Sequence, residues 1–230
     1  MIRIDSLTLA YKARTILEDA SLHLRKGELC ALVGRNGAGK STLLRAITSS
    51  DKVTINGLSV GDMKAERLAQ EVAIVTTERL RVADLRAKEV VAMGRAPYTN
   101  WIGRLQDIDH QIVEEALEMV GMSNFADRLI STLSDGELQR IMIARAIAQQ
   151  SAVILLDEPT AFLDIPTRFE VCRLLKRLAQ SGKTILFSTH DIDSALDVCD
   201  SVAIISEKHL EKLPTSEARR VLGQIFGFEQ

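Results

Sequence analysis

The sequence predicts an α/β fold built on a mixed, mostly parallel sheet with helices on both of its faces. Short apolar runs at Leu29–Val33, Val153–Leu156 and Thr184–Phe187 are typical of strands that other layers cover on both sides. Apolar residues at helical spacing over Ile165–Ser181 and Asp191–Cys199 predict helices that alternate with these strands. Alternation of strands and helices along a chain favours a parallel sheet.

Further strands are expected at the N-terminus and at two later positions. Apolar and polar residues alternate in Ile2–Ile4, Leu7–Leu9 and Ser21–Leu24, which predicts an N-terminal antiparallel β subdomain with one exposed face. Val72–Val75 and Val202–Ile205 are short apolar runs that complete the predicted set of strands.

The stretch from about 82 to 150 differs from the rest of the chain because it lacks a strong strand pattern. Its apolar residues recur every three or four positions, as from Ile112 to Val120, which predicts helices. We therefore predict an α-helical subdomain inserted between two strands. The expected organisation is one domain, residues 1–230, with an α/β core at about 1–81 and 151–230.

Composition and charge limit the possible function classes. The 230 residues are 46% hydrophobic and carry 29 basic against 31 acidic side chains, a net charge of −2 that argues against nucleic-acid binding. No apolar run approaches the roughly 20 residues of a membrane-spanning helix, and the N-terminus lacks the apolar region of a signal peptide. Cys30, Cys172 and Cys199 fit neither a zinc site nor a disulfide framework. We therefore expect a soluble cytosolic protein with three buried, reduced thiols.

A glycine-rich loop follows the strand predicted at Leu29–Val33. Gly34-Arg-Asn-Gly-Ala-Gly-Lys40-Ser41 fits the phosphate-loop pattern G-x-x-x-x-G-K-[ST], and a helical pattern over Thr42–Thr48 follows it. The glycines let backbone N–H groups turn toward phosphate oxygens at a helix N-terminus. Lys40 would place a cation between the β- and γ-phosphates, and Ser41 would offer its hydroxyl to Mg²⁺. The loop predicts a triphosphate site in a P-loop NTPase (RecA-like) core.

Two acidic residues follow the strand predicted at Val153–Leu156. Asp157 and Glu158 would lie at the carboxyl end of this strand, where open α/β sheets bind their ligands. Asp157 would contact Mg²⁺ through a water molecule, and Glu158 would polarise the attacking water. Together with the phosphate loop, these acids favour triphosphate hydrolysis over a pair of solvated surface charges.

Further motifs resemble those of the ATP-binding-cassette (ABC) ATPases. Leu133-Ser-Asp-Gly-Glu-Leu-Gln-Arg140 is similar to the family signature L-S-G-G-Q followed by x-Q-R. Ala161-Phe-Leu-Asp164 matches the D-loop of the family, and His190 matches its switch histidine. Tyr11 lies where the family stacks an aromatic ring on adenine. The resemblance covers essentially all of residues 1–210.

The resemblance implies a head-to-tail homodimer that holds two ATP molecules, each between the phosphate loop of one copy and the signature of the other. It also implies that ATP binding closes the dimer and that hydrolysis loosens it. The implied catalytic residues are Glu158, His190 and Glu78, and the implied Mg²⁺ ligands are Ser41, Asp157 and Glu78. The implied ATP-binding residues are Tyr11, Gly34, Asn36, Gly37, Ala38, Gly39, Lys40, Ser41, Thr42, Ser134, Gly136, Glu137 and Asp164.

Three features depart from the family pattern. Glu78 is nearest to the position of a family glutamine, and a carboxylate there adds a charge and removes a hydrogen-bond donor. The signature has Asp135 for glycine and Glu137 for glutamine, so negative charge near a triphosphate could slow hydrolysis unless a cation compensates. The link at 49–53 is shorter than is usual in the family.

The region after Glu78 resembles the importers of iron–siderophore, haem and cobalamin. Glu89–Trp101 contains the V-x-x-G-R-x-P stretch of that branch. The resemblance implies an ATP-hydrolysing subunit that lies peripherally at the cytoplasmic face of the inner membrane and contacts integral membrane permease subunits. A periplasmic or lipoprotein substrate-binding protein would be an indirect partner. The residues expected to line the groove for the permease are Met93, Tyr98, Trp101 and Ile102.

Two alternative functions remain open. A soluble ABC ATPase of iron–sulfur assembly, ribosomes or nucleic acid would share the motifs, although such proteins tend to carry tandem cassettes or long insertions. A GTPase would carry an Asn-Lys-x-Asp string, which is absent, and a small-molecule kinase would need no signature string. Nothing in the sequence identifies the transported compound or a role for Thr215–Gln230.

Overall fold

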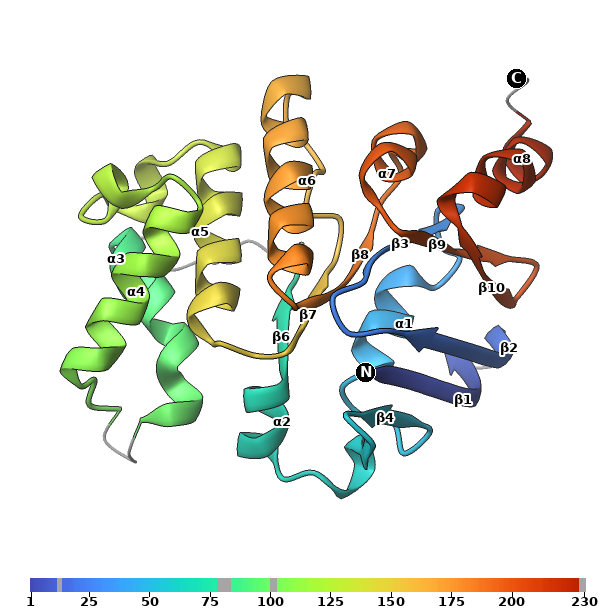
Figure 1. Cartoon of the computed structure of the whole chain (residues 1–230), viewed down its shortest axis with the longest axis horizontal. Coiled ribbons are helices and arrows are strands. Elements are labelled where there is room, and N and C mark those ends of the chain that lie inside the picture. Colours follow the sequence, from blue (N-terminus) through green and yellow to red (C-terminus); the bar gives the residue numbers. More distant parts are fainter. Residues whose placement is uncertain (12–13, 78–83, 100–102, 228–230) are drawn as a thin grey trace.

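The computed structural model describes residues 1–11, 14–77, 84–99 and 103–227. Its larger sheet has the strand order β10-β9-β3-β8-β7-β6 among these residues (Figure 1). Neighbouring strands run parallel except at one edge, where β10 pairs antiparallel with β9. The strands are β3 (Leu29–Gly34), β6 (Val72–Val75), β7 (Val153–Leu156), β8 (Thr184–Ser188), β9 (Ser201–Ser206) and β10 (His209–Pro214). The predicted α/β class with a mixed sheet is confirmed.

A second, antiparallel sheet is formed by residues near the N-terminus. β2 pairs with β1, which pairs with β4, and β4 pairs with β5. The predicted strand at Ser21–Leu24 is only the end of β2, because register shifts along the β1–β2 pair interrupt the alternation that precedes it. The strands are β1 (Ile2–Tyr11), β2 (Arg14–Leu24), β4 (Val53–Ile55) and β5 (Leu58–Ser59).

Helices surround the larger sheet, and α3, α4 and α5 gather at one end of the molecule, with α8 at the other (Figure 1). Between β6 and β7 the described residues form helices, turns and one isolated bridge, Arg86 to Leu129. The subdomain boundaries at 82 and 150 stay a prediction. The helices are α1 (Lys40–Ala46), α2 (Ala65–Glu71), α3 (Ala87–Ala92), α4 (Asp107–Met119), α5 (Asp135–Ala148), α6 (Ile165–Gln180), α7 (Ile192–Val198) and α8 (Thr215–Phe226), with 3₁₀ turns η1 (Val60–Asp62), η2 (Met93–Tyr98), η3 (Ser123–Phe125) and η4 (Ile130–Thr132).

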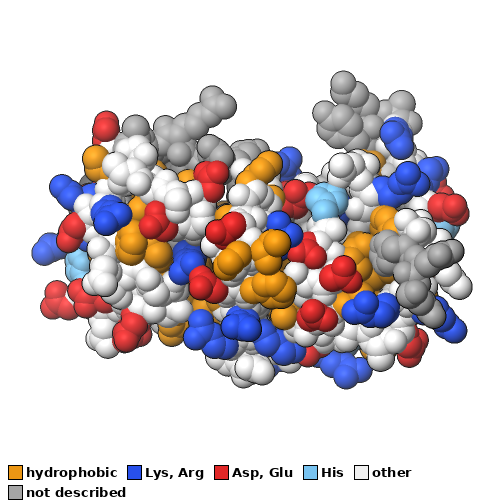
Figure 2. Space-filling view, turned by 90° about the horizontal axis from the view of Figure 1, so that it is seen from above, with side chains coloured by type: hydrophobic (Ala, Val, Ile, Leu, Met, Phe, Trp, Pro, Cys, Tyr) orange, Lys and Arg blue, Asp and Glu red, His pale blue; other side chains and the backbone are white. Residues whose placement is uncertain are grey.

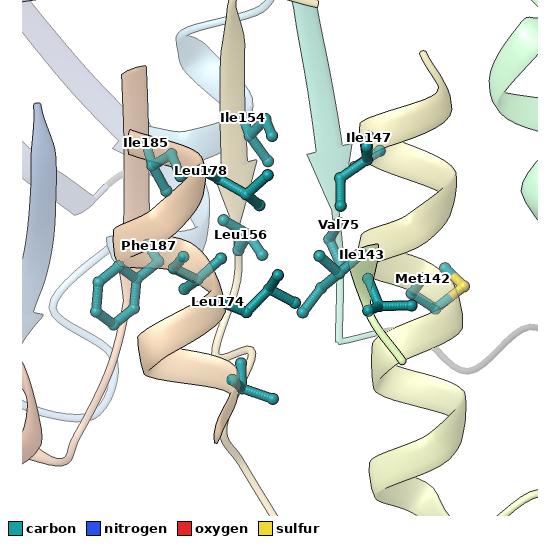
Figure 3. Close-up of a cluster of buried hydrophobic side chains, with 14 of the residues drawn as sticks. Val75, Met142, Ile143, Ile147, Ile154, Leu156, Leu174, Leu178, Ile185 and Phe187 are labelled. Atoms are coloured by element: carbon teal, nitrogen blue, oxygen red, sulfur yellow. The ribbon is translucent and has the colours of Figure 1, made fainter. Parts of the chain in front are cut away.

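The core lies on both faces of the larger sheet, which explains the continuous apolar runs of its strands. On one face, α5 and α6 cover β6, β7 and β8, and Figure 3 shows side chains of both helices packed against those of the strands. Leu174 and Leu178 of α6 point toward Leu156, while Ile143 of α5 points toward Val75. On the other face, α1 and the antiparallel sheet cover the same strands.

The three cysteines are free and buried. Burial raises the pKa of the Cys30 thiol to about 12 and that of Cys172 to about 11, so both stay protonated and unreactive at neutral pH. Among the described residues, the helices are all too short or too polar to cross a membrane.

Candidate functional site

The phosphate loop joins β3 to α1. β3 ends at Gly34 and α1 begins at Lys40, two residues earlier than the predicted helix. Gly37 and Gly39 have φ angles of 75° and 102°, in the left-handed region that favours glycine. At Gly39 a side chain is also excluded sterically, because a Cβ atom there would lie 2.1 Å from Cγ2 of Ile16. The loop therefore has the backbone conformation that turns amides inward around an anion.

Lys40 is held at the mouth of this loop. Its side chain is buried, and Nζ donates to the carbonyl oxygen of Gly34 at 3.0 Å. Nζ also lies 3.3 Å from Nε2 of His190, which is 2.7 Å from Oε1 of Glu158. Burial lowers the pKa of Lys40, and the nearby carboxylates of Glu158 and Asp157 partly oppose this shift. The structure thus brings the predicted phosphate-binding cation, the histidine and the acid together.

The two acids follow β7 as predicted. Asp157 continues the sheet, because its backbone N–H donates to the carbonyl of Val75 at 2.8 Å. Ser188 orients both acids: its hydroxyl donates to Oδ1 of Asp157 at 2.7 Å and accepts from the backbone N–H of Glu158 at 2.8 Å. Glu158 has a φ of 49°, a strained conformation for a side-chain-bearing residue and one that recurs at functional sites.

The signature residues form the N-terminus of α5. Ser134 is the N-cap residue, and its hydroxyl accepts from the backbone N–H of Glu137 at 3.3 Å. Oε2 of Glu137 accepts in return from the backbone N–H and hydroxyl of Ser134, at 2.7 and 2.9 Å. These hydrogen bonds lower the pKa of Glu137. A Cβ at Gly136 would lie 2.9 Å from Cγ2 of Thr167, so glycine permits the close packing of α5 on α6.

The residues after Glu158 lead into α6. Asp164 caps this helix, and its Oδ1 accepts from the backbone N–H of Thr167 at 3.0 Å. Phe162, two residues earlier, is 90% exposed with a φ of 62°. The N-terminal ends of α5 and α6 point to the same side of the molecule (Figure 1), and Figure 2 shows apolar side chains gathered near the centre of that face among charges of both signs.

Several cavities are lined by the predicted site residues that the structure describes. One, of about 610 Å³, is lined by phosphate-loop residues Asn36 and Gly37 together with β9 and α8. Another is smaller and lies between α5 and the segment after β7, with Asp135, Glu158 and Phe162 in its wall. Asn36 of the phosphate loop and Asp135 of the signature line different cavities, and His190 lines further cavities beside Gly34 and Glu158.

Some predicted residues cannot be placed. Glu78, Trp101 and Ile102 lie outside the described residues, and so does the side chain of Tyr11. Mg²⁺ usually takes one or two protein oxygens together with phosphate oxygens and water. Ser41 in the first turn of α1 and Asp157 after β7 fit that donor set. No cluster of three or more metal-binding side chains occurs in the part of the chain that the structure describes.

The comparison with protein families decides the identity. The ABC transporter family profile matches residues 17–161, more than half of the chain. The chain belongs to the ABC transporter ATP-binding family. This cassette is 35% identical to a petrobactin import ATP-binding protein of Bacillus anthracis, over 100% of this chain and 88% of that protein. It is 38% identical to an iron(3+)-hydroxamate import ATP-binding protein of Bacillus subtilis, over 83% of this chain and 73% of that protein.

Solved ABC structures share the fold of this cassette. A transporter assigned to the metal-chelate type, in an inward-facing conformation, gives a TM-score of 0.85 at 27% identity and covers 98% of this chain and 88% of that one. A dimeric cassette bound to ADP and phosphate after hydrolysis gives a TM-score of 0.80 at 26% identity, over 94% and 99% of the two chains. The cassette described here is accordingly an ABC-type ATPase.

Sequence reasoning missed three contributors to the candidate ATP site of the cassette. Ser188 precedes the switch-histidine segment and orients both acids, and Ile16 of β2 closes over Gly39. Gln224 and Ile225 of α8 line the cavity at the phosphate loop, although no element was predicted in residues 215–230. Ser188 was adjacent to a recognised motif, whereas Ile16 and α8 reach the site only through tertiary packing.

Proposed function

We propose that this chain is the ATP-hydrolysing subunit of a bacterial importer for metal chelates of the iron–siderophore, haem or cobalamin type. The observation that carries this assignment is the match over the full chain to a petrobactin import subunit, together with the match to a hydroxamate import subunit. A cobalamin import ATP-binding protein of Halobacterium salinarum is also 34% identical over 89% of this chain, which is 52% of that protein. The subunit would act at the cytoplasmic face of the membrane.

The phosphate loop supplies the binding half of the ATP site in this proposal. Backbone amides of residues 37–42 and the ammonium group of Lys40 hold the phosphates, and Tyr11 stacks on adenine. Ser41, Asp157 and Glu78 provide oxygens for Mg²⁺, which neutralises phosphate charge when bound. Because Lys40 already lies 3.3 Å from His190, the γ-phosphate would meet groups that are in place before it binds.

Hydrolysis requires a positioned water and a proton acceptor. Glu158 accepts a proton from the water molecule while the water oxygen attacks the γ-phosphorus. The bond between the γ-phosphorus and the bridging oxygen of ADP breaks in the same step. His190 then donates a hydrogen bond to the γ-phosphate instead of to Glu158, its present partner at 2.7 Å. The contribution of these residues is orientation and charge stabilisation, as in other phosphoryl transfers.

One chain supplies only half of each complete site. Asp135, next to Ser134 in the signature, lines one cavity, whereas Asn36 of the phosphate loop lines another. A head-to-tail homodimer would bring Ser134 and Gly136 of one copy to the γ-phosphate held by the other, with the N-terminus of α5 as an anion site. ATP would favour the closed dimer because the γ-phosphate contacts both copies, and hydrolysis would remove that contact.

The permease would bind on the side of η2. Met93 and Tyr98 are 44% and 39% exposed there. Methionine and aromatic side chains are enriched at the buried centres of protein interfaces. Trp101 and Ile102, which the sequence adds to this surface, lie outside the described residues. An external substrate-binding protein would select the chelate and act only through the permease.

Substitution of Glu158 by glutamine tests the ATP-driven dimer. Glutamine keeps the shape of Glu158 but cannot take the proton, so Glu158→Gln should lose at least about 100-fold in turnover and accumulate as a dimer with ATP. Light scattering after size exclusion, with ATP or ADP, measures this. Glu114→Gln on the exposed side of α4 is the matched control and should behave as the parent.

Lys40→Ala in the Glu158→Gln background should abolish the dimer, because ATP binding is lost. Parental hydrolysis by Glu158→Gln would contradict the role of Glu158, and tight nucleotide binding by Lys40→Ala would contradict that of the phosphate loop.

A further inference from the structure

Arg95 is a buried arginine whose partners lie far from it in the sequence. Its side chain and that of Asp109 are each 5% exposed, and Nε of Arg95 donates to Oδ1 of Asp109 at 2.8 Å. Nη1 donates to the carbonyl oxygen of Ala148 at 2.7 Å and to Oε1 of Gln150 at 3.0 Å. The guanidinium also stacks on Tyr98, 4.1 Å from the ring centroid. A buried charge is tolerated only with such a set of partners.

These contacts join the ends of two helices. Asp109 caps the N-terminus of α4, where Oδ2 accepts from the backbone N–H of Gln106 at 2.9 Å. That hydrogen bond and the one from Arg95 hold the pKa of Asp109 below its usual range. Ala148 is the last residue of α5, where carbonyl groups lack partners within the helix and a cation is favourable. Arg95 therefore bridges the start of α4 to the end of α5.

The backbone of η2 lies directly on the last turn of α5. A Cβ at Gly94 would lie 2.3 Å from the carbonyl oxygen of Arg145 and 3.1 Å from the backbone nitrogen of Gln149, so the two segments have no space between them. The hydroxyl of Tyr98 donates to the carbonyl oxygen of Gln149 at 3.0 Å. Closely packed protein interiors transmit strain, so a shift of η2 would also move the end of α5.

The opposite end of α5 carries the signature. The helix has 14 residues, about 21 Å at 1.5 Å per residue. Ser134 at its start belongs to the ATP side of the molecule, whereas Met93 and Tyr98 beside its end are exposed on the surface assigned above to the permease.

We infer that Arg95 is a positioning residue that locks α5 to η2, so that the permease-facing surface sets where Ser134 meets the nucleotide of the partner copy. This inference rests on the proposed function, because it assumes the ATP-bound dimer and the permease contact. Without Arg95, α5 samples several orientations relative to η2, and only a fraction of molecules presents the signature correctly. Dimer formation then needs more ATP, while nucleotide binding to the phosphate loop is unchanged.

A purely structural role for the ion pair makes a different prediction. Removal of one partner would leave a buried charge and lower stability, whereas replacement of both by apolar residues usually restores it. The double variant Arg95→Met/Asp109→Leu separates the roles, because it removes the charge problem but also the hydrogen bond to Ala148. Val113→Ala in the core of α4 is the matched control, since it lowers stability without touching this network.

The experiment uses the full chain with Glu158→Gln to prevent turnover. It measures the ATP concentration for half-maximal dimer, the affinity for ADP and the thermal midpoint. The double variant should need about tenfold more ATP, the change expected for loss of one hydrogen bond to a charged group. Its ADP affinity should equal that of the parent. Arg95→Lys keeps the charge but loses the paired donors, so its ATP concentration for half-maximal dimer should lie between those of the parent and the double variant. Val113→Ala should dimerise as the parent does at temperatures below its thermal midpoint.

The outcomes distinguish the positioning role of Arg95 from a purely structural role. Parental dimer formation by both the double variant and Arg95→Lys would overturn the inference, as would a parallel loss of ADP affinity in either one. A Glu158→Gln parent that stays monomeric with ATP would overturn the proposed function and this inference with it. If the double variant fails to fold, Arg95→Lys alone tests the inference. A raised ATP requirement for the dimer with parental ADP affinity would support it, and a parental ATP requirement would overturn it.

Discussion

Lys40, His190 and Glu158 form a row of close contacts at the candidate ATP site of this cassette. Nε2 of His190 lies between the ammonium group of Lys40 at 3.3 Å and the carboxylate of Glu158 at 2.7 Å. The cation and the acid therefore partly neutralise each other before any nucleotide arrives. An entering γ-phosphate would draw Lys40 and His190 toward itself and leave Glu158 free to accept a proton. In our account, substrate binding activates the acid in this way.

Glu137 is one of the two residues at which this chain departs from the family signature. Hydrogen bonds from Ser134 lower its pKa, so the carboxylate is charged at neutral pH. That negative charge stabilises the N-terminus of α5 in the free chain. It would repel the γ-phosphate of the nucleotide held by the partner copy.

Glu137→Gln should therefore close the dimer at lower ATP concentrations, with a loss of at most about 1 kcal/mol in the free energy of unfolding. Light scattering at graded ATP concentrations and urea unfolding measure the two effects. Glu217→Gln, in the first turn of α8, is a control for removing one helix-end carboxylate. A dimer that forms no more readily than in the parent would show that the Glu137 charge does not hinder closure.

At the scale of elements, α5 connects most features of the molecule. Its start carries the signature, its middle packs on the sheet through Ile143, and its end rests on η2 at Gly94. We predict that Gly94→Ala destabilises the fold by about 2–3 kcal/mol, because overpacking against a fixed backbone carbonyl forces η2 away from α5.

Gly121→Ala is the matched control for Gly94→Ala. Gly121 has a φ of 71° and open space around its Cα, so the added methyl costs only backbone strain, of the order of 1 kcal/mol. Chemical denaturation of both variants measures the difference. Equal destabilisation would mean that η2 and α5 are not in rigid contact.

Elements that are marked by a continuous apolar run or by a turn motif could be predicted from the sequence. The strands around the phosphate loop and the acids, the loop itself and α6 follow from apolar runs and turn chemistry, and the structure contains them. The start of β2 at Arg14 was missed because register shifts hide its alternation. The Arg95–Asp109 pair was missed for another reason: its partners come from three separate segments, and only tertiary packing brings them together.

At the scale of the whole molecule, the cassette has two faces with different tasks. The face at the carboxyl ends of the parallel strands gathers the phosphate loop, the acids and the signature, and in the proposed dimer a second copy would supply the other half of each ATP site. The surface at η2 exposes Met93 and Tyr98 and is connected to the first face through α5. In the proposed function, this arrangement would let the nucleotide state of the cassette move a bound membrane protein.

The most direct test of this account is affinity purification of the tagged chain from detergent-solubilised membranes of its own source, without ATP. We predict recovery of a polytopic membrane protein in stoichiometric amount. It should be lost with Met93→Glu but not with Met119→Glu, which changes another exposed methionine, at the end of α4. Recovery of ribosomal or assembly proteins from the soluble fraction instead, unaffected by Met93→Glu, would contradict the importer assignment and favour a soluble ABC ATPase.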